Sequence, residues 1–446
     1  MSRLNFRAAA LGCVAAFGLL SAPMAGQAIA ITNAEIHVRG GQIIQNGTIV
    51  MQNGRITAVG ANVSIPNGAR RIDGTGKIIT PGLIDSSSQV GLGEIGGQAP
   101  GTQDASTSLS DLGATFNPIR AVNPENTHIP ITRLGGVTSA VIRPGGGPLF
   151  DGQAGVIALD GTRVSDMILR ESVAVYTSMG ESGSGNEGGG SRAALQMRLH
   201  DALWDVRAQM MNDDADEDGD EAHEGDGDED NAGDDDDGDP MREGGRSSLT
   251  ERHRDALVPM MRGDIPLVVT VNRLSDIHLA LDLQEEFGFR MVIQGGAEAW
   301  RAADELAAAG VAVIVNPTGN LPTFDGLGAT MENAGMLADA GVVVLFGGGR
   351  SMMHMAGLAI ANGMSPGAAG DGLSMAAAEV WGIADQVGSL EVGKRADVVV
   401  WSGDPFELST SAEHVFIGGR EIPEDSRQER LFERYRNLER YRRIGG

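Results

Sequence analysis

The chain has a single cysteine, Cys13, among its 446 residues. Cys13 lies in an apolar run near the N-terminus that is typical of a signal peptide, so the mature chain would carry no thiol. Such a chain forms no disulfide and offers neither a cysteine nucleophile nor a thiolate metal ligand. A lipid-modified cysteine is the alternative, but it would be expected to end the apolar run, which continues to Leu20.

Positive charge is also scarce: the formal net charge is -26. Seventeen of the 60 acidic residues lie in residues 212–240, a segment without lysine or arginine. Removing those 17 charges leaves -9 for the rest of the chain, which is therefore only mildly acidic. Nucleic-acid binding requires a basic face, so we predict no nucleic-acid partner.

No apolar run is long enough for a membrane span of ~20 residues. The N-terminus instead has the parts of a signal peptide: Arg3 and Arg7, the apolar run of residues 8–20, and a cleavage signal at residues 28–30. We predict a signal peptide over residues 1–30, cleavage after Ala30, a periplasmic location, and no membrane span after cleavage.

The most informative stretch is residues 77–94, KIITPGLIDSSSQVGLGE. It resembles the first barrel strand of the metal-dependent amidohydrolase superfamily, in which the motif ends in Asp-x-His-x-His and both histidines bind metal. Ser87 and Gln89 stand at the two histidine positions. A hydroxyl and a neutral carboxamide replace imidazole poorly on zinc or a similar cation.

Three further phrases, NPENTHIPITRLGGVTSAVIRPGGG, GGSRAA and VIQGGAEAW, resemble the imidazolonepropionase-like subgroup of that superfamily. The resemblance covers roughly residues 31–420. It implies an α/β fold, a (β/α)8 TIM-like barrel inserted into a small β-sandwich formed by both chain ends. It also implies hydrolysis of carbon–nitrogen bonds other than peptide bonds.

The pattern along the chain fits this division. Short strands separated by the turn signals Asn46-Gly47, Asn53-Gly54 and Asn67-Gly68 predict a β-sheet over residues 31–80. A similar pattern of short strands over residues 386–423 would complete this sheet. Residues 81–385 alternate strand-like and helix-like segments, as βα units do. Strands are predicted at residues 137–142, 266–271, 290–293, 311–315 and 342–346, and helices at residues 192–211, 249–261, 275–287, 297–309 and 330–340.

Two segments stand apart from this pattern. Residues 212–240 consist mainly of Asp, Glu and Gly and have almost nothing to bury, so we predict a disordered insert. A calcium loop is not completed there, because Gly225 takes the place of its final glutamate. Residues 424–446 predict a charged helix with seven arginines and an apolar stripe. That helix would dock on its own barrel or contact a partner.

The resemblance allows the other metal positions to be followed. The later histidines of the superfamily correspond to Thr270 or Asn272 and to Gln294 or Gly295, and the water-activating Asp falls in residues 347–350, where none occurs. The only lysines, Lys77 and Lys394, fall outside the predicted barrel, which excludes a carboxylated lysine bridge. We therefore predict no metal and no other cofactor.

A mostly neutral polar ring would remain at the barrel mouth. As candidate binding residues the sequence predicts Asp85, Ser87, Gln89, Thr270, Asn272, Gln294 and Arg350. His354 is the only histidine placed to reach the rim. The glycine clusters at residues 143–147 and 185–192 have the spacing neither of a P-loop nor of a dinucleotide turn, so we predict tight turns there rather than a phosphate site.

Three functions remain open. The first is a non-catalytic partner or regulator, for example of a catalytically complete amidohydrolase paralogue. The second is an active hydrolase with an atypical site, and the third is a periplasmic module that binds a small polar ligand. The fold does not choose among them, because function depends on the site.

Overall fold

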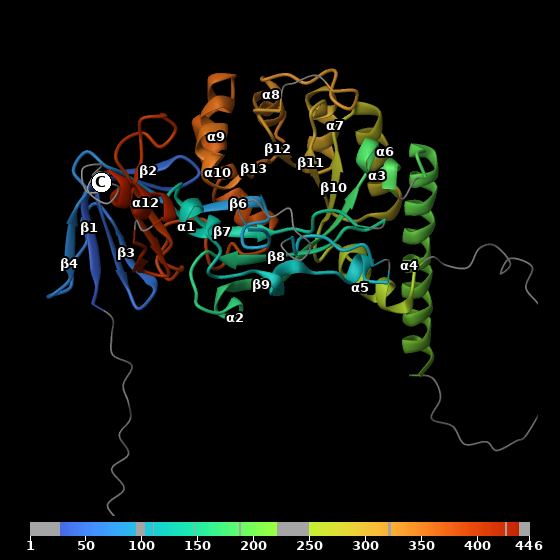
Figure 1. Ribbon diagram of the computed structural model, residues 1–446, viewed down its shortest axis with the longest axis horizontal. Helices are drawn as coiled ribbons and strands as arrows, with labels where there is room; N and C mark the ends of the chain where they lie inside the picture. The colour runs from blue at the N-terminus through green and yellow to red at the C-terminus, as the bar shows by residue number, and fades with distance from the viewer. Residues whose placement is uncertain are drawn as a thin grey trace, which may run out of the picture.

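The computed structural model describes residues 27–94, 103–109, 111–147, 149–186, 189–220, 249–319, 323–423 and 426–436. These residues form two eight-stranded sheets. One, at the left of Figure 1, is built from both ends of the chain, and the other curls into a nearly closed barrel in the middle of the molecule. The fold is therefore the predicted mixed α/β architecture, a barrel between two halves of a terminal β-domain.

The terminal sheet joins strands from before and after the barrel. Its order is β16-β15-β14-β5-β1-β2-β3, and β4 pairs with β1. Because β14 runs antiparallel to β5, with Val399 opposite Thr80, the two chain ends share one hydrophobic core. The strands are β1 (Ile29–Arg39), β2 (Gln42–Gln52), β3 (Arg55–Gly60), β4 (Arg70–Asp73), β5 (Ile78–Pro81), β14 (Val398–Trp401), β15 (Ala412–Ile417) and β16 (Arg420–Glu421).

Only some of the predicted turn signals act as hairpin turns. Asn53 and Gly54 both have positive φ, 52° and 79°, as the turn between β2 and β3 requires. Asn46 also has positive φ, but it lies inside β2, where the pairing with β1 is irregular. The prediction of a chain reversal at Asn46-Gly47 is therefore wrong, since one left-handed residue can be absorbed by a local irregularity within a strand.

The barrel strands follow one another around the sheet in sequence order. They are β6 (Leu83–Ser88), β7 (Val137–Ile142), β8 (Gly152–Ala158), β9 (Ile168–Ser178), β10 (Leu267–Val271), β11 (Met291–Gly295), β12 (Ala312–Val315) and β13 (Val344–Phe346). Strand pairs from β9 to β13 are parallel, and so is the pair β6–β7. Strand β8 is antiparallel to both β7 and β9.

The sheet has the eight strands of the expected (β/α)8 barrel, but β8 is antiparallel to its neighbours where that barrel would have a parallel strand. A parallel connection needs a crossover of about a dozen residues or more. Only residues 143–151 join β7 to β8, and residues 159–167, with the one-turn helix α2 (Val164–Met167), join β8 to β9. Neither link contains a helix long enough to cross the barrel, so the chain reverses at both.

Hydrogen bonds from the loop after β13 to the first strand close the barrel. The carboxylate of Asp85 on β6 accepts hydrogen bonds from the backbone N–H groups of Gly348 (3.2 Å), Gly349 (3.0 Å) and Ser87 (3.2 Å). A Cβ on Gly347 would lie 2.9 Å from the Cβ of Ser87, so the two segments approach as closely as only glycine allows. Asp85 therefore has a structural role at the closing seam.

Helices surround the barrel on its outer side (Figure 1). They are α1 (His128–Arg133), α3 (Gly180–Asn186), α4 (Arg192–Asp220), α5 (Glu251–Met261), α6 (Leu274–Phe287), α7 (Ala303–Ala308), α8 (Asn333–Asp339), α9 (Met352–Ala361) and α10 (Pro366–Gly372), with short 3-10 turns at Gly113–Thr115, Pro118–Ala121, Ala299–Ala302 and Gly349–Ser351. Helix α4 reaches Asp220, whereas the sequence predicted its end at Met211. The rest of the predicted acidic insert, residues 221–240, lies outside the described residues.

A separate hydrophobic core fills the barrel interior. Inward residues of the strands, such as Val268 and Leu345, pack against Ala377 of α11 (Met375–Val380) and against Trp381 just after it. Trp381 is 1% exposed, and its indole Nε1 donates a hydrogen bond to the Ser86 hydroxyl on β6. Helix α11 and Trp381 thus close the barrel interior.

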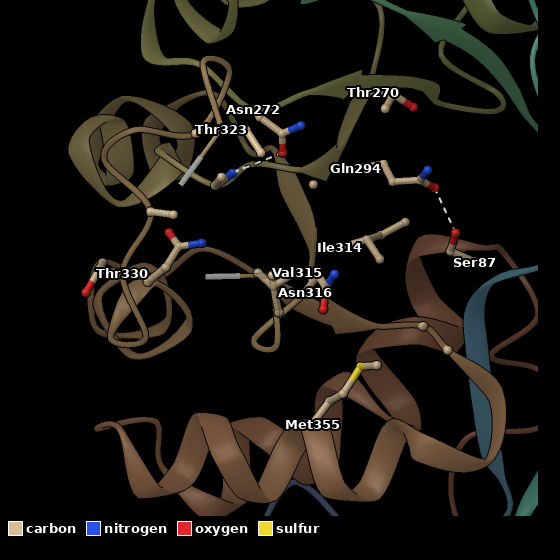
Figure 2. Close-up of a pocket in the computed structure, with 18 residues that line it drawn as sticks. Ser87, Thr270, Asn272, Gln294, Ile314, Val315, Asn316, Thr323, Thr330 and Met355 are labelled. Carbon is tan, nitrogen blue, oxygen red and sulfur yellow. Dashed lines mark hydrogen bonds between the residues drawn. The ribbon is translucent and has the colours of Figure 1, made fainter. Parts of the chain in front are cut away.

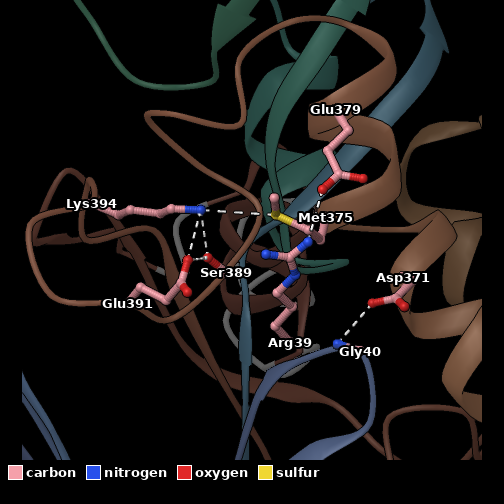
Figure 3. Close-up of polar contacts among 8 residues, drawn as sticks. All are labelled: Arg39, Gly40, Asp371, Met375, Glu379, Ser389, Glu391 and Lys394. Carbon is pink, nitrogen blue, oxygen red and sulfur yellow. Dashed lines mark hydrogen bonds and ion pairs between the residues drawn. The ribbon is translucent and has the colours of Figure 1, made fainter.

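Polar contacts hold the terminal sheet against the barrel (Figure 3). Arg39 pairs with Glu379 at 2.9 Å, and the backbone N–H of Gly40 donates to Asp371 at 2.9 Å. Lys394 donates to Ser389, while the other lysine, Lys77, pairs with Glu413 on β15. Both lysines therefore lie outside the barrel interior, as the sequence predicted.

The N-terminal prediction is only partly covered by the described residues. Residues 1–26, with Cys13, lie outside them, and export stays a prediction. Cleavage after Ala30 would remove the first two residues of β1, in which Ala30 is fully buried and pairs with Val50. Within the described residues, no helix combines the length and the apolar character that crossing a membrane requires.

Helix α12 (Arg427–Tyr435) follows the terminal sheet. The Ser426 hydroxyl caps it by accepting from the N–H of Glu429. None of its residues is buried, and its apolar side chains Leu431 and Phe432 are 39% and 61% exposed. The part of the predicted C-terminal helix that the structure describes therefore does not dock on its own barrel; residues 437–446 lie outside the described residues.

Candidate functional site

The carboxyl ends of the parallel strands surround a cavity of about 460 Å³ (Figure 2). Four predicted candidates line it: Ser87, Thr270, Asn272 and Gln294. Because β6, β10 and β11 all end at this edge, side chains far apart in the sequence meet there. Asn316, Thr323, Thr330, Asn333 and Met355 complete much of the wall. The volume lies within the usual range of roughly 300–1,000 Å³ for ligand pockets.

A directed chain of hydrogen bonds crosses the mouth. The Nε of Arg143 donates to the Ser87 hydroxyl at 2.8 Å, and that hydroxyl donates to the Oε1 of Gln294, also at 2.8 Å. Arg143 additionally donates to the carbonyl oxygen of Pro144. Ser87 is thus held between a guanidinium and a carboxamide and is not beside a base that would activate it as a nucleophile.

Asp85 does not line this cavity. It is 1% exposed and holds the barrel seam, and burial raises the pKa of its carboxyl although four hydrogen-bond donors act in the opposite direction. Gln89 and Arg350 line a neighbouring cavity of about 440 Å³ with His128, on the other side of Gly348. The predicted ring of seven residues is therefore divided: four share the mouth, one lies beneath it, and two face elsewhere.

His354 is not a rim residue of the mouth. It lines a separate cavity of about 260 Å³ with Leu134, Trp401 and Leu408, next to the terminal sheet. The prediction that it could reach the mouth is wrong, since the chain after β13 turns into α9 and carries His354 to the side of the barrel.

A fourth cavity, also of about 260 Å³, adjoins the mouth and shares Thr270 and Gln294 with it. Arg143, Asp151 and Tyr176 line it, together with the glycines at residues 145–147. The glycines do form the predicted turn, in which the N–H of Gly147 donates to Asp151. Burial raises the pKa of Tyr176, so its hydroxyl remains protonated at neutral pH.

Arg143, Tyr176 and Asn316 are pocket residues that the sequence reasoning missed. For two of them a signal was present. Arg143 directly follows β7 and Asn316 directly follows β12, in the same relation that Asn272 has to β10. The first polar residue after a barrel strand projects into the mouth. Tyr176 has no such signal, because it is buried within β9.

The residues at the mouth do not fit a catalytic metal. Within the described parts of the chain, no three His, Cys, Asp or Glu side chains are grouped so as to hold a metal ion. The mouth offers hydroxyls and neutral amides, which are weak donors for zinc. Arg143, a permanent cation, is hydrogen-bonded to Ser87, the residue that the sequence resemblance aligns with the first histidine. A metal cation would be repelled there.

Comparison with known proteins identifies the class of this barrel. The profile of the Amidohydrolase family matches residues 304–422. The crystal structure of an amidohydrolase from Thermotoga maritima MSB8 is similar, with a TM-score of 0.75 and 26% identity over 89% of this chain and 99% of that one. The structure of molinate hydrolase shares the fold, with a TM-score of 0.52 and 18% identity over 90% of this chain and 95% of that one.

Among curated proteins, imidazolonepropionase of Vibrio cholerae serotype O1 is 42% identical over 48 residues. That match spans 11% of this chain and 12% of the relative's length. Together the barrel, the composite terminal sheet and these matches show the amidohydrolase fold. The chain is a member of the metal-dependent amidohydrolase superfamily.

Proposed function

We propose that this protein is an exported, non-catalytic member of the amidohydrolase superfamily that acts as a partner or regulator. The observation that carries the proposal is the contact between Arg143 and Ser87, 2.8 Å from nitrogen to oxygen. A guanidinium on the residue that corresponds to the first metal ligand is incompatible with a metal-activated water.

Coulomb's law gives the size of the repulsion between a metal ion and the Arg143 guanidinium. A doubly charged ion about 4 Å from a guanidinium would be repelled by roughly 8 kcal/mol at an effective dielectric constant of about 20. Among the described residues, no carboxylate lines the 460 Å³ cavity to offset this repulsion. Without a metal, the hydrolytic mechanism of the superfamily lacks the group that lowers the pKa of water.

Binding of a small polar ligand is the second candidate function. The mouth supports this function, because it holds an open cavity lined by amides and hydroxyls, whereas a site without any function could have been filled by side chains. An atypical hydrolase finds less support, since neither a base next to Ser87 nor a group of metal ligands occurs among the described residues.

The metal content of the protein tests the proposal directly. We expect the protein purified from its native compartment, without chelators, to contain well under one equivalent of zinc, iron, manganese, cobalt or nickel. Plasma mass spectrometry measures all five metals together, and a catalytically complete amidohydrolase purified in parallel is the control. One stoichiometric transition metal per chain would contradict the non-catalytic assignment.

Helix α12 supplies a candidate contact for a partner. Its exposed Leu431 and Phe432, among arginines, suit an interface with an apolar centre and a polar rim. We expect affinity capture from native extracts to recover an amidohydrolase that carries His-x-His, and truncation after Pro423 to reduce its yield about 10-fold or more.

A matched pair of variants separates this contact from general damage to the fold. Changing Leu431 and Phe432 to serine should lower the recovery as truncation does, whereas the same change at exposed Leu408 should not. Melting temperatures should be equal for all variants, because none of these side chains is buried. Recovery of this chain alone, at native abundance and in mild salt, would favour the ligand-binding function.

A further inference from the structure

Four carboxamides line the 460 Å³ cavity, and the oxygen of each is engaged by the protein itself. The amino group of Asn333 is also used, because it donates to the carbonyl oxygen of Gly296, which leaves Asn272, Gln294 and Asn316. A carboxamide offers one acceptor and two N–H donors, so when its oxygen is already bonded it presents mainly donors to a ligand. The orientation of each amide can be argued from its partner.

Gln294 is oriented by the chain that starts at Arg143. The Ser87 hydroxyl accepts from the Nε of Arg143, so its own proton is donated onward to Gln294. The atom of Gln294 that receives it must be the oxygen. The Nε2 amino group of Gln294 is then available to a ligand.

Asn272 and Asn316 are oriented by backbone N–H groups. A backbone N–H can only donate, so the amide atom that faces it must be the oxygen. The Oδ1 of Asn272 accepts from the N–H of Ala297 at 3.4 Å (Figure 2). The Oδ1 of Asn316 accepts from both the N–H and the hydroxyl of Thr318, at 3.2 and 2.7 Å. Neither Nδ2 group donates a hydrogen bond to a described residue.

The adjoining cavity adds one charge and one more donor. Arg143 forms no ion pair with any carboxylate in the described part of the chain, and its two bonds use the Nε and Nη1 atoms. The Tyr176 hydroxyl is buried and has no hydrogen-bond partner in the described part of the chain, although Tyr176 lines the cavity. A buried hydroxyl left unpaired is a cost to the folded protein that a ligand would relieve.

The nearby acids are already satisfied. Both oxygens of Asp151 accept hydrogen bonds, from the N–H of Gly147 and the hydroxyl of Ser178, each at 2.9 Å. Asp85 is engaged by the barrel seam. Burial raises the pKa of Asp151, and the charge of Arg143 acts in the opposite direction, but the two groups form no direct ion pair. No carboxylate among the described residues therefore occupies the hydrogen-bonding groups of the guanidinium.

We propose that the mouth binds a small organic anion, a carboxylate whose remaining polar groups are hydrogen-bond acceptors, with the carboxylate at Arg143 and Tyr176 and the rest facing Asn272, Gln294 and Asn316. The two cavities are continuous at Thr270 and Gln294, so one ligand can reach both. This inference requires neither the protein partner nor the absence of catalysis, because it concerns binding alone.

Isothermal titration calorimetry of the full-length protein, treated with chelator, tests the assignment. Three probes share a five-carbon chain: glutarate, its uncharged dimethyl ester, and 1,5-diaminopentane, which is cationic and rich in donors. We expect glutarate to bind about 10-fold or more tightly than the ester, and the diamine not to bind. Inorganic phosphate is titrated to separate an organic-anion site from a general oxyanion site.

Two conservative variants distinguish a ligand site from a structural role. Tyr176→Phe removes only the unpaired hydroxyl, so glutarate affinity should fall about 10-fold while the melting temperature stays equal or rises. Asn316→Asp keeps the bonds from Thr318 but replaces a donor by a negative acceptor, and should lower affinity at least as much. Exposed Arg120→Gln is the surface control.

Three results would overturn the inference. One is an absence of glutarate binding, and another is equal binding of the ester. The third is unchanged affinity in both Tyr176→Phe and Asn316→Asp. Phosphate binding tighter than that of glutarate would overturn the assignment to an organic carboxylate. A metal found in the untreated protein would contradict the proposed function but leave these affinities unaffected, so the two failures are distinguishable.

Discussion

Replacing Trp381 by alanine should destabilise the protein by about 3–5 kcal/mol, the usual cost of removing a fully buried Trp. Trp381 is 1% exposed and packs inside the barrel against inward residues such as Val268 and Leu345. Its removal leaves a large cavity and takes away the hydrogen bond to Ser86 on the first barrel strand. Urea unfolding followed by circular dichroism measures the loss.

Trp204 is the matched control, because it is 44% exposed on α4. Trp204→Ala should cost within about 1 kcal/mol. Trp381→Phe should fall between the two, since it keeps most of the volume but not the indole N–H. Equal effects of the two alanine substitutions would mean that α11 and Trp381 do not close the barrel core.

Asp85→Ala should cost roughly 3 kcal/mol or more. The substitution leaves the N–H groups of Ser87, Gly348 and Gly349, whose hydrogen bonds to Asp85 are partly buried, without their acceptor. Each donor left unsatisfied away from water costs about 1–3 kcal/mol. Because Gly348 also lines the mouth, glutarate affinity should fall together with stability. Thermal unfolding and calorimetry on one preparation give both numbers.

The Asp85→Asn variant provides a pH signature for the same group. Burial raises the pKa of Asp85 above the value of 3.8 that it has when exposed, so the folded state binds the proton more tightly than the unfolded state. The wild type should therefore gain stability relative to Asp85→Asn as the pH falls through the raised pKa toward 3.8, and lose it as the pH rises.

Other acids shift in the opposite direction but are shared by both proteins. Hydrogen bonds from His37 and Gln45 lower the pKa of Glu35, and one from Ser389 lowers that of Glu391, so both contribute stability that is lost in acid. These contributions cancel in the difference between wild type and variant. A difference that does not change with pH would contradict the raised pKa of Asp85.

Much of the fold could be predicted from local sequence. The strands at residues 137–142 and 311–315 are short apolar runs bounded by breakers, and their places in the chain match β7 and β12 closely. Strands β8 and β9 were not predicted, and the antiparallel direction of β8 depends on link lengths that no local pattern expresses. The extension of α4 beyond Met211 was also missed, since composition describes what a segment can bury and not whether an existing helix continues.

The candidate site was predicted less completely. Ser87, Thr270, Asn272 and Gln294 do line one cavity, because each lies at or just after the end of a barrel strand. Gln89 lies in the loop after β6 and Arg350 in the 3-10 turn after β13, and strand positions do not determine the direction of either segment. Arg143 directly follows β7, but the sequence interpretation treated residues 143–147 only as a tight turn and did not predict Arg143 as a pocket residue.

By itself the sequence determined the chemistry available to this protein: no thiol outside the predicted signal peptide, two lysines at the terminal sheet, and serine and glutamine at the two positions where the superfamily places histidines. Those conclusions need only residue identities and a resemblance. The tertiary structure alone decided which groups face one another. The bond from Arg143 to Ser87, the orientation of the three amides and the unpaired hydroxyl of Tyr176 exist because the barrel brings together segments from residues 85 to 349, which are distant along the chain.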